Sequence, residues 1–566
     1  MPTTPNDGQL KDKMTELKKK SYSKKPSKKE RLAAELAQKE QKARAQSIVT
    51  AGGVVIRADG VAMSAVALAA RQKALQMAQA QDTQNAQGAH NVHDFGAPQN
   101  PRARGKAKTD ASASIPKIEA AQASGKRLAQ CLWCAQILLV DVLKFEAAAD
   151  KQVSQFLRGH KELGARDRHI VAETVYAVLR HRRVLAHLAQ TGAGALERRL
   201  VLLAAQKVVD MDSLQAAIAE EEFAWVSETL KAPVDGLPAA VRSNLPDEWF
   251  NALVGAYGED EALKLTGALN QSAPLDVRVN TIKSSREAVQ IAFEHAGIES
   301  AVCEYAPLGL RLLKKPALQK LDVFITGAIE VQDEGSQLLT HLLGAKRGEM
   351  VADFCAGAGG KTLAIGAMMR NTGRLYAFDI AAHRLAKLKP RLARSGLSNV
   401  QTIAIDSEKD IRVKRLAGKF DRVLVDAPCS GLGTLRRNPD LKWRHGLDSV
   451  ARLVQVQASI LESAAKLVKA GGTLVYATCS VLPDENQNIV QAFLSAHPEF
   501  ELVAAREVLA TQKIDIPESA EREGCLQLLP HVHQTDGFFA AYLRKGKPSK
   551  LGKPAAEFVV QDKKES

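Results

Sequence analysis

The sequence predicts a multidomain α/β protein whose largest part is a parallel sheet with helices on both faces. Segments of strand and helix character alternate from residue 346 to about residue 545, which is typical of such a sheet. Helical periodicity fills residues 128–235, and residues 236–345 mix both characters. The chain has 566 residues, of which 45% are hydrophobic, so it can build about three or four domains.

Residues 1–125 have the composition of a disordered basic arm. Residues 1–50 contain 13 Lys and Arg against 6 Asp and Glu, and Ala/Gln-rich and polar sequence follows. Such a segment buries too little apolar surface to offset the entropy that ordering costs. Two interpretations stay open, an arm that binds nucleic-acid phosphates or a solvated linker. Residues 546–566 form a second charged tail.

The whole chain carries a formal net charge of +15, which suits a polyanionic partner as well as simple solubility. It has no apolar run of about 18 residues, which a transmembrane helix would need. Its N-terminus lacks the charged segment followed by an apolar segment that is typical of a secretory signal peptide. Seven cysteines are an odd number, which fits a reduced protein better than a disulfide framework. We therefore predict a cytoplasmic protein that does not act at a membrane.

Residues 128–235 are expected to form a helical bundle, since apolar residues recur at helical spacing in 137–143 and 170–179. Cys131 and Cys134 form a lone C-x-x-C pair in this segment. Zinc takes four ligands and no second pair follows at a suitable spacing, so we predict no metal site.

Residues 236–345 are expected to form a small α/β module. Pro246 suits the first position of a helix. Residues 274–281 alternate like a half-buried strand, with Val277 and Val279 on one face, and a helix is expected at about 284–296.

Residues 346–545 contain predicted strands at 350–354, 375–378, 402–405, 422–425 and 473–477. Parallel sheets bind ligands at the carboxyl ends of their strands. The first strand leads into a loop that contains Gly357, Gly359 and Gly360, where the backbone can approach a ligand closely. The spacing is neither G-x-G-x-x-G nor a P-loop, because Thr362 and Cys355 stand where those motifs need glycine.

An acidic residue follows each of the next three strands. Asp379 is placed to accept both ribose hydroxyls of a nucleoside, and Asp406 to accept from an adenine amino group. Asp426 follows the fourth strand. Capping of the next helices is the alternative. The recurrence of acids at three strand ends favours cofactor binding.

Two cysteines lie at neighbouring strand ends, Cys429 after the fourth strand and Cys479 after the fifth. One such cysteine would be interpreted as a small buried apolar residue. Two of them fit a specific chemistry, because carbon 5 of cytosine becomes nucleophilic only after a thiolate adds to carbon 6. Asp426 is placed to neutralise charge on the pyrimidine, and the spacing leaves open which thiol attacks.

Three motifs together resemble the RsmB/Nop/Sun family of RNA cytosine-carbon-5 methyltransferases. They are Asp426-Ala427-Pro428-Cys429-Ser430-Gly431, Tyr476-Ala477-Thr478-Cys479-Ser480 and Glu330-Val331-Gln332-Asp333-Glu334-Gly335-Ser336-Gln337. The likeness covers about 236–545. The helical segment, with Leu163-Gly164-Ala165-Arg166-Asp167-Arg168 and Glu173-Thr174-Val175-Tyr176, resembles the NusB-like RNA-binding domain of bacterial small-subunit rRNA enzymes.

The resemblance implies an architecture, a cofactor and a substrate. It implies a Rossmann-like class I methyltransferase domain at 346–545, a small α/β RNA-contacting module at 236–345, and an all-α NusB-like domain at 128–235. The implied cofactor is S-adenosyl-L-methionine and the implied substrate is RNA, with 16S ribosomal RNA as the target. Arg278 and Asn280 match the family's Arg-x-Asn-Thr element in the RNA-contacting module.

The resemblance also implies roles for single residues. Cys479 is the nucleophile, Cys429 promotes product release and Asp426 is catalytic. Cofactor contacts carry over to Cys355, Ala356, Gly357, Ala358, Gly359, Gly360, Lys361, Asp379, Asp406 and Asp426. The family usually reads Cys-Ala-Ala-Pro-Gly-Gly-Lys-Thr here, so this loop has lost a proline and gained a glycine.

Other functions and other residues remain in view. Methylation of a protein or of an exocyclic nitrogen needs no thiol, whereas methylation of another RNA such as tRNA or a non-enzymatic role in ribosome assembly stays open. His531 and His533 alternate on an expected strand and are interpreted as structural. Trp443 and Arg444 contact RNA or pack in the core, with equal support.

Overall fold

The computed structural model describes residues 48–50, 54–56, 62–64 and 124–547, which belong to two units, Met1–Ile115 and Pro116–Ser566. In the first unit, β1 (Ile48–Thr50), β2 (Val54–Ile56) and β3 (Ala62–Ser64) form an antiparallel sheet. These strands differ from the prediction of an arm without regular structure; β1 and β2 consist of β-branched residues, which favour strands locally, whereas β3 does not. The rest of that arm, and the tail beyond residue 547, lie outside the described residues.

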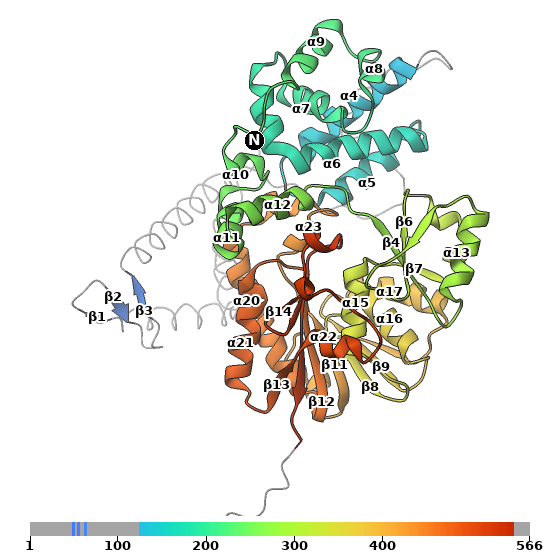
Figure 1. The fold of residues 1–566 in the computed structure, drawn as a ribbon, viewed down its shortest axis with the longest axis vertical. Coiled ribbons are helices and arrows are strands. Elements are labelled where there is room, and N and C mark those ends of the chain that lie inside the picture. Colours follow the sequence, from blue (N-terminus) through green and yellow to red (C-terminus); the bar gives the residue numbers. More distant parts are fainter. Residues whose placement is uncertain (1–47, 51–53, 57–61, 65–123, 548–566) are drawn as a thin grey trace, which may run out of the picture. The chain divides into compact units, whose positions relative to one another are not determined.

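The second unit begins with helices. They are α4 (Ser124–Val142), α5 (Ala149–Gly159), α6 (Ala165–Leu188), α7 (Leu196–Ala205), α8 (Met211–Gln215) and α9 (Glu220–Thr229), and they lie together in Figure 1. The Asp167 carboxylate fixes the start of α6, because it accepts from the Gly164 N–H at 2.8 Å and pairs with Arg127. The backbone of α6 leaves helical geometry at His181, which kinks the helix.

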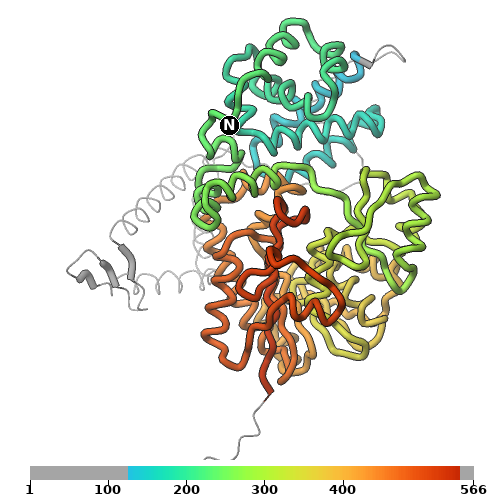
Figure 2. The backbone as a smooth tube through the Cα atoms, viewed as in Figure 1, coloured from blue at the N-terminus to red at the C-terminus, as the bar shows by residue number. Residues whose placement is uncertain are grey.

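A small α/β module follows. It contains α10 (Ala239–Arg242), α11 (Asp247–Tyr257), α12 (Glu259–Leu269), α13 (Arg286–His295) and α14 (Asp322–Ile325). An antiparallel sheet orders its strands β5 (Ser300–Val302), β6 (Gly309–Leu312), β4 (Leu275–Val279) and β7 (Ile329–Val331). Val277 and Val279 of β4 are fully buried, as the alternation in the sequence predicts. Figure 2 traces the chain from the helices through this module into the large sheet.

The large sheet has nine strands, and five of them are parallel. The parallel strands run in the order β10 (Val400–Ala404), β9 (Arg374–Asp379), β8 (Met350–Asp353), β11 (Phe420–Asp426) and β12 (Val468–Thr478). An antiparallel part extends it through β16 (Phe538–Lys545), β15 (Cys525–Leu528) and β14 (Glu521–Arg522), with β13 (Phe500–Val503) also paired to β16. The predicted parallel sheet is therefore correct for the strands that precede the site residues, and the antiparallel extension was not predicted.

Helices cover both faces of this sheet, so each strand buries alternate residues on opposite sides. Tyr376 and Phe378 of β9 pack with α20 (Leu447–Ala465) and α21 (Gln487–Ala496). Leu375 packs on the other face, with α15 (Glu334–Leu343), α16 (Gly360–Met368) and α22 (Ala505–Ala510). This is the Rossmann-like α/β arrangement.

The expected strand at His531 and His533 is wrong, because these residues form the short helix α23 (Pro530–His533). Pro530 starts that helix, where its missing N–H costs nothing, and the left-handed Gln534 ends it. No helix among the described residues is long and apolar enough to cross a membrane.

Candidate active site

The loop between β8 and α16 is held in a tight conformation at the carboxyl edge of the sheet. Gly357 and Gly359 both have positive φ, at 58° and 84°. A Cβ at Gly359 would collide with the side chain of Leu388 on α17 (Ala382–Ser395). The Gly357 N–H donates to the Asp379 carboxylate at 2.7 Å. The predicted loop and the predicted acid are therefore in direct contact.

The three predicted acids have different surroundings. Asp379 is 4% exposed, and its second oxygen accepts from the Ala381 N–H at 2.7 Å. Asp379 therefore accepts hydrogen bonds from the backbone of the glycine loop and from the backbone just before the next helix. The Asp406 side chain is 98% exposed and lies 3.5 Å from Arg412. It does not cap the next helix, since Asp410 does so.

Asp426 lies at the end of β11 and pairs with Lys361 of α16, with 2.7 Å between the Lys361 Nζ and a carboxylate oxygen. Burial lowers the pKa of Lys361, but the charge and hydrogen bond of Asp426 outweigh it, so that the pKa is raised. The lysine is therefore a cation at neutral pH. The family resemblance predicts Lys361 as a cofactor contact, and the structure shows it as the partner of the predicted catalytic acid.

The two cysteines meet because β11 and β12 are parallel neighbours that end together. The Cys429 and Cys479 sulfurs lie 3.3 Å apart, and both residues are half-buried. The hydrogen bond with Cys479, burial and the nearby charge of Glu485 raise the pKa of the Cys429 thiol well above its usual range. The edge of the sheet thus brings two thiols, a carboxylate and an ammonium group together.

Comparison with known proteins shows the family of the chain. A family model described as the 16S rRNA methyltransferase RsmB/F matches residues 340–544, and an RsmF/B-like ferredoxin-like domain model matches 245–319. The probable ribosomal RNA small subunit methyltransferase B of Synechocystis is 31% identical over 442 residues, which cover 72% of this chain and 98% of the relative. The chain belongs to the RsmB/Nop/Sun family of ribosomal RNA methyltransferases.

Other relatives agree with this family membership. The probable ribosomal RNA small subunit methyltransferase B of Bacillus subtilis is 35% identical over 324 residues, which cover 56% of this chain and 70% of the relative. The crystal structure of PH0851 superposes with a TM-score of 0.60 and 25% identity, over 76% of this chain and all of that one. The protein is thus an RNA methyltransferase with an α/β methyltransferase fold.

Two buried acids of this family member escape prediction from sequence. Asp353 ends β8 and is 1% exposed; one carboxylate oxygen accepts from Thr362 Oγ1 at 2.7 Å. The other has no hydrogen-bond partner among the described residues. Glu485 is fully buried in the short 3-10 helix Pro483–Glu485, beside the Cys429 turn. The only signal for Asp353 is its position before the glycine loop, and Glu485 has none.

The Arg-x-Asn-Thr element binds protein groups in the structure. Arg278 is 2% exposed and donates to the Gln332 side chain at 2.7 Å. Asn280 is 3% exposed and donates to the carbonyls of Gly327 and Ser395. Ser395 ends α17, so this element joins the small module to the methyltransferase domain.

Trp443 also makes a packing contact. Its indole N–H donates to the Leu179 carbonyl of α6 at 3.1 Å, and the Arg182 guanidinium lies 4.9 Å from its ring. The core-packing interpretation is therefore the one with observed contacts. Arg444 pairs with Asp440 at 3.4 Å.

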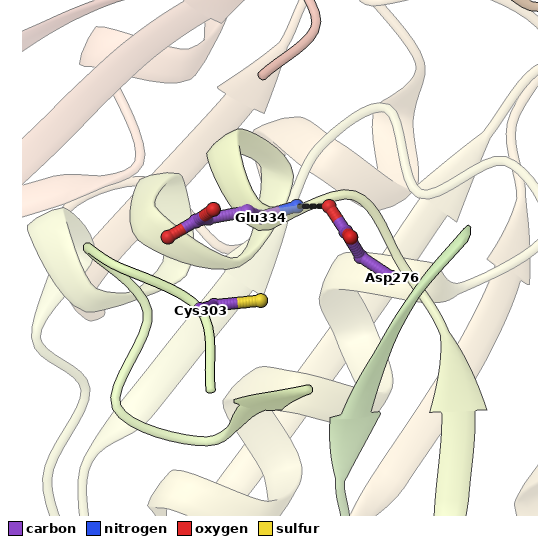
Figure 3. A group of neighbouring side chains, drawn as sticks. All are labelled: Asp276, Cys303 and Glu334. Atoms are coloured by element: carbon purple, nitrogen blue, oxygen red, sulfur yellow. Dashed lines mark hydrogen bonds between the residues drawn. The ribbon is translucent and has the colours of Figure 1, made fainter. Parts of the chain in front are cut away.

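The Cys131 and Cys134 thiols are buried in α4, and burial raises their pKa to about 12 and about 11. Another cluster, Asp276, Cys303 and Glu334, brings three potential metal-ligand atoms within 4.8 Å of one another (Figure 3). Its charges are already paired, because Arg311 contacts Asp276 at 2.7 Å and Glu334 at 3.2 Å. We interpret it as an ion-pair network that ties the small module to α15.

Proposed function

We propose that this enzyme transfers a methyl group from S-adenosyl-L-methionine to carbon 5 of a cytosine in 16S ribosomal RNA, through a covalent bond between Cys479 and carbon 6. The observation that carries the proposal is the 3.3 Å contact between the Cys429 and Cys479 sulfurs beside the Asp426–Lys361 pair. A methyltransferase that acts on a protein or on an exocyclic nitrogen has no use for such a pair of thiols.

The residues present fit the cofactor. Gly357 and Gly359 adopt the positive φ that lets the loop backbone turn tightly at the edge of the sheet, and Asp379 offers a carboxylate for ribose hydroxyls. Ile380 follows it with a side chain that is 70% exposed, which suits an apolar contact with a purine. Asp406 is exposed, and its carboxylate, which lies 3.5 Å from Arg412, offers an oxygen to an adenine amino group. When bound, the cofactor supplies the methyl group as an electrophile.

Cys479 begins the proposed reaction. Its thiol gives its proton to water, and the sulfur bonds to carbon 6 while the electrons of the carbon 5–carbon 6 double bond make carbon 5 nucleophilic. Negative charge then develops on the pyrimidine. Lys361, a cation through its raised pKa, can compensate that charge, and Asp426 holds its ammonium group in place through the 2.7 Å contact.

Release follows methyl transfer. Carbon 5 loses its proton to solvent, and the bond between Cys479 and carbon 6 breaks to restore the aromatic ring. We assign Cys429 to this step, because its sulfur lies 3.3 Å from the Cys479 sulfur, so that its thiol can give a proton to the departing sulfur and regain one from water. The target base must leave its stack to reach these thiols, so a single-stranded or flipped cytosine is expected.

The helices α4–α9 are proposed to be the NusB-like domain that helps to select the RNA. These helices lie outside the two family models. The helix α6, which follows the loop at Gly164, carries Arg166 and Arg168 in its first turn. Cations at such a position suit phosphate contacts. We also propose a cytoplasmic location, where ribosomal RNA is available.

The proposal is tested by transfer of labelled methyl groups to unmodified small-subunit ribosomal RNA. Cys479→Ala should abolish transfer, and Cys429→Ala should trap a protein–RNA adduct that survives a denaturing gel. Cys525→Ala, in β15 and away from the site, is the control and should behave like the wild type.

Three results would redirect the proposal. Methyl transfer by Cys479→Ala would disprove the nucleophile. Label incorporated into tRNA but not ribosomal RNA would change the substrate. Full cellular function of Cys479→Ala, without any methylation, would support a non-enzymatic assembly role.

A further inference from the structure

Glu485 lies outside both cysteine motifs and contacts the residue that follows Cys429. We propose that Glu485 is a positioning residue that holds the Cys429 turn against Cys479 for release of the methylated base. This inference rests on the proposed covalent mechanism, in which Cys429 acts only at the release step. Neither family motif nor spacing in the sequence points to this role.

The carboxylate of Glu485 binds the Cys429 turn through both oxygens. One oxygen accepts from the Ser430 N–H at 2.8 Å, and the other accepts from the Ser430 hydroxyl at 2.5 Å. Gln457 of α20 donates from one amide nitrogen to Glu485 at 3.0 Å and to the Pro428 carbonyl at 3.0 Å. Residues on both sides of Cys429 are therefore fixed by one buried network.

The same network reaches the turn that carries Cys479. The Ser430 hydroxyl lies 3.3 Å from the Ser480 hydroxyl. Asn486, the neighbour of Glu485, donates to the Ser480 carbonyl at 3.0 Å and accepts from the Thr478 hydroxyl at 2.5 Å. Glu485 and Asn486 thus form hydrogen bonds with residues that flank both cysteines.

The cost of this arrangement indicates a functional reason for it. Glu485 is fully buried, and none of the described Lys, Arg or His side chains forms an ion pair with it. A buried carboxylate without a cation is expensive, and here only the hydrogen bonds from Ser430 and Gln457 offset its cost. Such groups are concentrated where catalysis needs them.

The charge of Glu485 also acts on the Cys429 thiol directly. The titratable groups that influence the pKa of Cys429 are Cys479, which hydrogen-bonds to it, and Glu485. The charges of Cys429 and Glu485 also raise the pKa of Tyr476, beside the larger effect of burial, and the Tyr476 hydroxyl donates to the Glu485 carbonyl at 2.7 Å. Removal of the carboxylate charge should therefore lower the pKa of Cys429 and move the alkaline limb of the release rate to lower pH.

Glu485→Gln tests the inference, because it keeps the shape of the side chain and removes its charge. We expect the single-turnover rate of methyl transfer to stay within about threefold of the wild type. Steady-state turnover should fall by about 10–100-fold, since a small misplacement of a reacting group costs that much. The protein–RNA adduct should accumulate as it does in Cys429→Ala.

Two further variants separate positioning from folding. Ser430→Ala removes the hydroxyl that Glu485 binds and should produce a smaller loss with the same adduct. Glu507→Gln, an exposed residue of α22, is the matched control and should turn over normally. The thermal midpoint of each variant is measured alongside, so that activity is compared only between folded proteins.

The outcomes distinguish this inference from the proposed function. If Cys429→Ala accumulates an adduct and Glu485→Gln turns over like the wild type, Glu485 has no positioning role. If Glu485→Gln lowers the single-turnover and steady-state rates equally, its role is structural and the inference fails. If neither Cys429→Ala nor the wild type ever forms an adduct, the covalent mechanism itself fails.

Discussion

At the scale of the residue, Asp353 has an unusual protonation. Burial raises its pKa to about 7; the hydrogen bond from Thr362 opposes this, and the neighbouring charge of Asp426 reinforces it. Asp353 lies directly before the glycine loop, so its protonation state changes the charge beneath the proposed cofactor site. A carboxyl group in the unfolded chain titrates near 4.

The raised pKa of Asp353 predicts that the stability of the folded protein depends on pH. The folded protein binds this proton more tightly than the unfolded chain does, so the contribution of Asp353 is complete below about pH 4 and is lost as pH rises through about 7. Asp353→Asn removes this dependence. The wild type should therefore lose stability relative to Asp353→Asn as pH rises. The thermal midpoint of the variant, compared with that of the wild type, should increase by roughly 4 °C or more between about pH 5 and about pH 8.5. A constant difference across that range would show that Asp353 is ionised throughout.

Site residues that belong to sequence motifs can be predicted from the sequence. Cys429, Cys479, Asp379 and Asp426 follow strands and are predictable from that position alone. Their partners are not, because the pairing of Asp426 with Lys361 joins residues 65 apart in the chain. Glu485 is one acidic residue in the polar run Pro483-Asp484-Glu485-Asn486, where nothing in the sequence marks it as buried.

At the scale of the element, the segment after Cys429 is locked by backbone contacts. The Gly433 N–H donates to the Cys479 carbonyl at 3.0 Å, and the Gly433 carbonyl accepts from the Gly537 N–H at 2.8 Å. A Cβ at Gly433 would collide with the backbone of Gly537. This close approach joins the segments that follow β11 and β12 to the segment that leads into β16.

Gly433→Ala should therefore destabilise the protein. We expect its free energy of unfolding to fall by about 1–3 kcal/mol, since an added methyl group must push backbone aside. Gly267→Ala is the matched control, because Gly267 lies in α12 with open space around it. That variant should keep or raise the unfolding free energy by up to ~1 kcal/mol. Urea denaturation measures both, and equal stability of Gly433→Ala and the wild type would contradict the packing described.

The parallel strands are the elements that sequence predicts well, because short apolar runs between helices have few other structures open to them. The antiparallel extension is harder to predict. The pairing of β16 with β12 joins segments about 60 residues apart, and β16 is a continuous apolar run that looks the same for either direction. The helix α23 is missed for a related reason, because four residues carry too little periodicity to distinguish a helical turn from a strand.

At the scale of the whole molecule, the unit Pro116–Ser566 is held together by buried polar contacts between its parts. Lys442 is 1% exposed and donates to the Arg180 carbonyl of α6 at 3.0 Å and to the Asn270 side chain, just after α12, at 2.6 Å. Burial lowers the pKa of this lysine well below its usual range. Sequence cannot predict this junction, since nothing in Leu441-Lys442-Trp443-Arg444 marks Lys442 as buried.

The organisation of the molecule suits an enzyme that must hold a folded RNA while it reacts with one base. A small antiparallel module and a set of helices precede the methyltransferase domain, and the net charge of the chain favours a polyanion. The residues proposed for the chemistry all lie at the edge of the large sheet. The step on which the proposed function depends is the covalent bond between Cys479 and carbon 6 of a cytosine.

The measurement that tests this claim most directly uses small-subunit ribosomal RNA that contains 5-fluorocytosine. Fluorine at carbon 5 cannot leave as a proton does, so the enzyme should stall as a methylated covalent adduct. Proteolysis and mass spectrometry then identify the modified residue. We predict a nucleotide on Cys479 that requires S-adenosyl-L-methionine. A nucleotide on Cys429, or methylation of ordinary RNA without any adduct on the fluorinated one, would contradict the account.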